Sequence, residues 1–170
     1  MAQSNRENAM ITTIALKDLI DVIKMMEEIE RLIAELYQAS GEAWVEDREF
    51  WLDTVAEEEK HANNIERMIK IVAAKPERFE LERPFNQTDI KTIKTGLEGN
   101  IERVKEGEIT REKMFNLARD IEASLIEKSY GEIVRTKDVE YQNLVNEITA
   151  DTSNHKKAME QQIHALKAGN

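Results

Sequence analysis

The sequence has no cysteine, only two prolines and six glycines among its 170 residues, and 5% aromatic side chains. The lack of cysteine excludes disulfides, thiolate metal sites and iron–sulfur clusters, and it gives no sign of an oxidising compartment. Scarce proline and glycine indicate long helices and little sheet. No apolar run approaches the ~18 residues of a membrane span, and no secretory signal is visible, so we expect a cytoplasmic protein.

Acidic side chains outnumber basic ones by 34 to 24, which gives a formal net charge of -10. This charge argues against partners that are themselves anionic, so we expect no binding to nucleic acid and none to membrane surfaces. Hydrophobic residues make up 41% of the chain and charged residues 34%, a balance typical of amphipathic helices. The length predicts one domain over residues 1–170.

Apolar residues recur at spacings of three and four over four long stretches, which predicts four long helices. These stretches are 12–39, 45–74, 110–135 and 139–167. Ser40 and Gly41 are expected to end the first helix, and Pro76 the second. A shorter helix is predicted over 88–106, after a connection at 75–86. The pattern predicts an all-α protein, an antiparallel four-helix bundle with an additional crossover helix between long helices two and three.

Acidic and imidazole side chains interrupt the apolar stripe of each long helix. They are Glu30 on the first helix, Glu58 and His61 on the second, Glu122 on the third and His155 on the fourth. Buried carboxylates repel one another and lose hydration, so several of them together need a positive partner. A pair of metal ions is the obvious candidate. The pattern therefore predicts a metal site inside the bundle.

Four of these residues also have an ordinary explanation when each is taken alone. Glu30 could reach water from the edge of a wide stripe. Glu58 and His61 could be an i,i+3 pair on a solvated face, and His155 could be a core histidine bonded to a neighbour on its own helix. Their coincidence on four stripes favours the metal site.

Three runs of sequence carry a family resemblance. They are Glu30-Arg-Leu-Ile-Ala-Glu-Leu-Tyr37, Ala56-Glu-Glu-Glu-Lys-His-Ala62, and Glu122 followed by Tyr130. The pattern resembles the ferritin-like di-iron carboxylate family, in which two helices each give a Glu and two each give Glu-x-x-His. Within that family it looks most like the di-iron bundle domain of rubrerythrins, without the cysteines of the rubredoxin-type centre.

The resemblance implies a ferritin-like fold and a role for each of these side chains. Glu30 and Glu122 would be terminal ligands, Glu58 a bridge, and the two histidines imidazole ligands. Tyr37 and Tyr130 would orient carboxylates or supply a proton. The implied cofactor is two irons, with manganese or zinc as alternatives. The implied state is a homodimer that receives electrons from a donor protein or directly from solution.

The fourth helix departs from the family pattern, because it reads Thr152-Ser-Asn-His155 where Glu-x-x-His is expected. Three carboxylates leave one positive charge with two divalent ions, or one negative charge with a single ion. Asp151 is turned about 100° off this face and is expected to hydrogen-bond His155 instead. One interpretation is a di-iron oxidoreductase of the peroxidase or ferroxidase type, acting on peroxide, dioxygen or ferrous iron. The alternative is a non-catalytic scaffold for binding or assembly, with one redox-inert metal or none.

Overall fold

The computed structural model describes residues 2–82, 87–124 and 130–168, with side chains from residue 16 onward except at 87, 89 and 130. Within these ranges the chain is mostly helical, which agrees with the all-α class. The helices are α1 (Ala2–Ala43), α2 (Arg48–Ala74), α3 (Gln87–Lys105), α4 (Arg111–Glu122), α6 (Tyr130–Ile133) and α7 (Val139–Ala168). Between them lie the strands β1 (Phe79–Leu81) and β2 (Val134–Thr136) and the 3₁₀ turns η1 (Val45–Asp47) and η2 (Pro76–Arg78).

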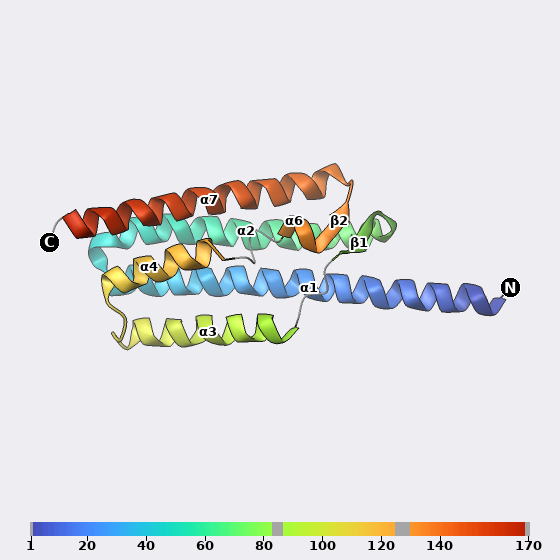
Figure 1. Ribbon diagram of the computed structural model, residues 1–170, viewed down its shortest axis with the longest axis horizontal. Helices are drawn as coiled ribbons and strands as arrows, with labels where there is room; N and C mark the ends of the chain where they lie inside the picture. The colour runs from blue at the N-terminus through green and yellow to red at the C-terminus, as the bar shows by residue number, and fades with distance from the viewer. Residues whose placement is uncertain (1, 83–86, 125–129, 169–170) are drawn as a thin grey trace.

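The long helices lie side by side in two antiparallel pairs (Figure 1). One pair is α1 with α2, and the other is α4 with α7; α2 and α7 also pack against each other. Helix α3 packs on the outer side of α1 and runs back along the molecule, so α2 and α4 point the same way (Figure 1). The shorter helix predicted over 88–106 is present as α3, at Gln87–Lys105.

The first helix continues past the predicted end at residue 39 and stops at Ala43. The expectation that Ser40 and Gly41 end it is wrong. Ser40 donates its hydroxyl to the Leu36 carbonyl at 2.8 Å, within the helix. A Cβ at Gly41 would lie 3.2 Å from the Cβ of Trp51. Glycine is therefore there because α2 approaches α1 closely, and not because the helix ends.

The predicted helix over 110–135 is also wrong in its second half. Thr110 caps α4 as expected, because its hydroxyl oxygen accepts a hydrogen bond from the Lys113 amide at 3.4 Å, but α4 ends at Glu122. Residues 125–129 lie outside the described part of the chain. After the single turn of α6, strand β2 pairs antiparallel with β1, with Leu81 opposite Val134. The sequence signal for β2 is the short alternation of apolar Val134 and charged Arg135, which the helical period of the preceding residues obscures.

The buried apolar side chains form two clusters along the molecule. One cluster gathers the C-terminal halves of α1 and α7 with Trp51, Phe115 and α3. The other gathers Ile23 and Met26 of α1 with the C-terminal half of α2, the strands and the start of α7. On α2 and α7 the buried residues between the two clusters are mostly polar, and together with Glu30 and Glu122 they form a polar layer across the core.

Candidate metal centre

Every ligand candidate from the sequence lies in this polar layer. Glu30, Glu58 and His61 are completely buried, while Glu122 and His155 are 1% and 6% exposed. They come from α1, α2, α4 and α7, because each occupies a core-facing position of a helix whose buried residues recur every three or four positions. The structure therefore brings all five predicted ligands to one place.

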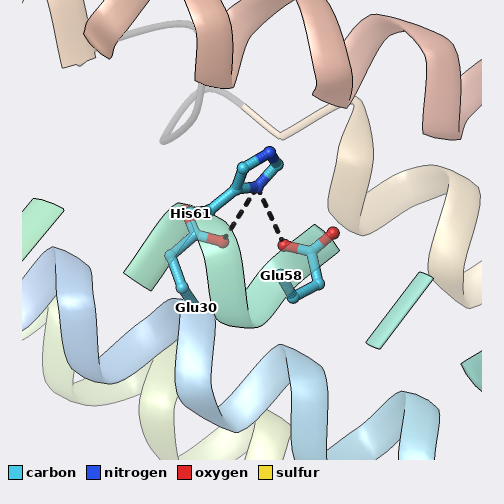
Figure 2. Close-up of side chains that lie close together, drawn as sticks. All are labelled: Glu30, Glu58 and His61. Carbon is cyan, nitrogen blue, oxygen red and sulfur yellow. Dashed lines mark hydrogen bonds and ion pairs between the residues drawn. The ribbon is translucent and has the colours of Figure 1, made fainter. Parts of the chain in front are cut away.

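Glu30, Glu58 and His61 form the first of two triads. Each offers one ligand atom, and these atoms lie within 4.8 Å of one another. His61 Nδ1 is 3.2 Å from Glu58 Oε2 and 3.9 Å from Glu30 Oε2. Figure 2 shows the imidazole facing both carboxylates, with its far edge directed toward α7. Two oxygens and one nitrogen thus converge on one side of Glu58.

Glu58, Glu122 and His155 form the second triad, again with ligand atoms within 4.8 Å of one another. His155 Nδ1 lies 2.9 Å from Glu58 Oε1 and 3.6 Å from Glu122 Oε2. Glu58 therefore belongs to both triads and turns one carboxylate oxygen to each histidine. The two imidazole rings are 5.6 Å apart, centroid to centroid. The two triads could therefore each hold a metal ion, with Glu58 common to both.

Several atoms of the second triad approach closely without forming hydrogen bonds. Glu58 Oε1, Glu122 Oε2 and His155 Nδ1 are all buried and have no hydrogen-bond partner within the described residues. A hydrogen bond requires the donor to point at the acceptor, so the 2.9 Å approach of Glu58 and His155 is a misaligned one. Buried polar groups left unsatisfied cost free energy. A cation between these atoms would satisfy all three.

The charges of the metal-free centre follow from its burial. Burial raises the pKa of Glu30 to about 8 and also raises the pKa of Glu122. Burial acts in the same direction on Glu58, but the neighbouring imidazoles of His155 and His61 lower its pKa to about 2. Burial opposes charge on the imidazoles, yet the neighbouring carboxylates raise the pKa of His61 to about 10 and that of His155 to about 11. At neutral pH two imidazolium ions therefore compensate Glu58 where metal cations would otherwise do so.

The outer nitrogen of each histidine faces a carboxylate from the opposite helix. His155 Nε2 is hydrogen-bonded to Glu57 Oε2 of α2 at 2.6 Å, and His61 Nε2 lies 3.6 Å from Asp151 Oδ2 of α7. Such partners fix the orientation of a metal-ligating imidazole. When Nε2 carries the proton of a neutral ring, the lone pair of Nδ1 faces the carboxylates of the triad, where a cation could bind.

These two outer carboxylates correct the sequence analysis. The expected hydrogen bond between His155 and Asp151 within α7 is wrong, because Asp151 faces His61 and accepts a hydrogen bond from Lys60 at 3.1 Å. The role of Glu57 was missed. A signal was present, since each histidine has an acidic residue four positions before it. The contacts cross between helices, so spacing along one helix could not assign them.

Tyr37 contacts the second triad directly. Its hydroxyl donates a hydrogen bond of 2.7 Å to Glu122 Oε1, and its fully buried ring lies 5.4 Å from that of Trp51. The contact holds one oxygen of Glu122 in place, and the role predicted for Tyr37 in a metal site stays a prediction. Tyr130 begins α6, but its side chain lies outside the described residues, so the prediction for it stays a prediction.

Thr152 lies on α7 one turn before His155, at 6% exposure. Its hydroxyl has no hydrogen-bond partner in the part of the chain that the structure describes. It occupies the position in Thr152-x-x-His155 that Glu58 occupies in Glu58-x-x-His61. The centre therefore holds three carboxylates and two imidazoles, with a hydroxyl at the position of a fourth carboxylate.

Comparisons of the chain with protein-family models, curated proteins and solved structures found no match. In the described residues, no helix carries an apolar stretch long enough to cross a membrane.

Proposed function

We propose that this chain binds two metal ions in the polar layer, one in each triad. The observation that carries the proposal is the position of Glu58, whose two oxygens lie 3.2 and 2.9 Å from the Nδ1 atoms of two buried histidines. The unsatisfied atoms of the second triad support it, because a cation would fill the point on which they converge. Glu30 and Glu122 would hold one ion each, and Glu58 would contact both.

Carboxylate oxygens and imidazole nitrogens suit iron, manganese and zinc, and affinity order alone does not choose among them. The resemblance to the ferritin-like carboxylate family favours iron. We therefore propose a ferritin-like bundle of α1, α2, α4 and α7 that carries a di-iron centre. Three carboxylates against two divalent ions leave a net charge of +1 before any further ligand binds.

The proposed activity is oxidoreduction of peroxide, dioxygen or ferrous iron. Bound iron would supply one-electron chemistry by changing between its ferrous and ferric states. The protein side chains would set the geometry: Tyr37 holds one oxygen of Glu122, and Glu57 holds the outer nitrogen of His155. Because the chain has no cysteine, electrons would come from a donor protein or from solution.

Metal titration of Glu58→Ala against Glu59→Ala tests the proposal. Glu58 is fully buried and shared by both triads, whereas Glu59 is exposed on the same helix. We expect the chelator-treated parent and Glu59→Ala to bind two ferrous ions per chain under anaerobic conditions, as measured by calorimetry and elemental analysis. Glu58→Ala should bind neither ion tightly. Equal stoichiometry in the two variants would refute the assignment.

A folded parent protein that binds no metal would favour the alternative function, a non-catalytic scaffold. Thr152 is the observation behind that alternative, because it removes one expected anionic ligand. Circular dichroism of the same samples separates loss of metal from loss of fold.

A further inference from the structure

The segment from Glu57 to His61 on α2 and the segment from Asp151 to His155 on α7 correspond in the structure as well as in the sequence. Glu57 of α2 reaches His155 of α7, and Asp151 of α7 faces His61 of α2. Each acidic residue lies four positions before the histidine of its own helix and contacts the other one. This reciprocal exchange makes α2 and α7 equivalent around the centre. Thr152 is therefore the counterpart of Glu58 in position as well as in sequence.

The Thr152 hydroxyl does not make the bond that other helical threonines of this chain make. Thr54, Thr92 and Thr149 each donate to the carbonyl oxygen four residues earlier, at 2.8–2.9 Å. Thr149 lies on the same helix as Thr152, so the difference is not one of helix geometry. Thr152 Oγ1 is buried and has no described partner, on the helix face that also carries His155. A buried hydroxyl without a partner costs free energy unless a ligand accepts from it.

We propose that a small monocarboxylate of the formate type binds beside Thr152 and replaces the missing fourth carboxylate. This inference rests on the proposed two-metal centre. A threonine oxygen stands one bond beyond Cβ, and glutamate oxygens stand three bonds beyond it. Formate supplies the missing carbon with two oxygens and one negative charge, while the Thr152 hydroxyl donates a hydrogen bond to it. The anion brings the ligand charge to four negatives, which balances two divalent ions.

The inference predicts that formate and metal bind cooperatively. Manganous ion is titrated calorimetrically into the chelator-treated protein, in bicarbonate-free buffer, with sodium formate or with sodium chloride at matched ionic strength. Coupling between ligands commonly amounts to roughly 5–150-fold in affinity, and it is reciprocal. We expect formate to tighten binding of the second ion within that range, and metal to tighten binding of formate by the same factor.

Three variants at the same position test the role of the hydroxyl. Thr152→Val is nearly the same size and should still bind manganous ion but lose the response to formate. Thr152→Ser keeps the hydroxyl and should keep the response. Thr152→Glu supplies the carboxylate from its own side chain. It should bind two ions with matched affinity, and formate should not change either affinity.

The outcomes separate this inference from the proposed function. If the parent binds two ions and formate changes neither affinity, the anion site is refuted while the metal centre stands. A formate response that survives in Thr152→Val would show that the anion binds elsewhere. If the folded parent binds no metal with or without formate, both proposals fail. Circular dichroism confirms the fold of each variant before titration.

Discussion

Metal binding by this chain should depend steeply on pH, because the proposed ligands hold protons when no metal is bound. His61 and His155 have pKa values of about 10 and about 11, and that of Glu30 is about 8. Between pH 5.5 and 7.5 these three groups must each lose a proton before they ligate. Each displaced proton raises the apparent association constant about tenfold per pH unit. Three protons released on binding of both ions predict a change of about a thousandfold per pH unit in the overall constant for the two ions.

Stability of the metal-free protein should follow the opposite trend. The histidine pKa values lie above 6.5 in the folded state, so their contribution to the free energy of unfolding is complete below pH 6.5 and is lost toward pH 10–11. Glu30 acts in the same direction, because between pH 4.5 and about 8 its carboxyl ionises in the unfolded state but keeps its proton in the folded state. Rising pH therefore weakens the metal-free protein and strengthens metal binding.

Thermal melts with and without manganous ion measure both trends. Metal at a hundredfold excess over its dissociation constant stabilises the folded state by about 2.7 kcal/mol. For a chain of this length that is roughly 5–11 °C in Tm. At one fixed metal concentration, the rise in Tm should be largest at pH 7.5 and disappear at pH 5.5. A rise that is the same at every pH, or no rise at all, would refute the assignment of these groups as ligands.

Two further comparisons test the surroundings of the centre. Glu57→Ala removes the partner of His155 Nε2 and should weaken metal binding about 10–100-fold. The control Glu59→Ala should leave the metal affinity unchanged. Equal metal affinities of the two variants would contradict an orienting role for Glu57. Gly41→Ala places a Cβ 3.2 Å from the Cβ of a buried tryptophan and should lower the free energy of unfolding by about 1–3 kcal/mol. Gly96→Ala has open space around the new Cβ and should raise the free energy of unfolding by about 0.5–1 kcal/mol. Denaturant unfolding measures both changes. Stabilisation by both glycine substitutions would show that α1 and α2 have room between them.

The long helices and the gathering of the ligands could be predicted because both follow from the helical period. Residues at spacings of three and four share a face, so Glu58 and His61 had to lie together on the side that buries Ile65 and Met68. The same reasoning placed Glu30, Glu122 and His155 on core-facing stripes before any contact between helices was known. The family resemblance, and not the helical period, marked Thr152 as the position of an expected fourth glutamate, one turn before His155.

Contacts between elements could not be predicted in this way. The pairing of β1 with β2 joins residues more than 50 positions apart, and no local period indicates such a contact. The sequence therefore gave no indication that the third long helix, α4, stops at Glu122 before β2. The sequence pattern predicted that Gly41 ends a helix. In the structure Gly41 is a position of close packing, because Trp51 lies against it.

The two outer carboxylates show the same division between local and tertiary information. Periodicity along α7 assigned Asp151 to His155, but the packing of α2 on α7 directs Asp151 to His61 and Glu57 to His155. The sequence determined which side chains each helix turns inward, because that depends on the geometry of a single helix. Only the tertiary structure decided which of them meet, because that depends on how two helices are packed together.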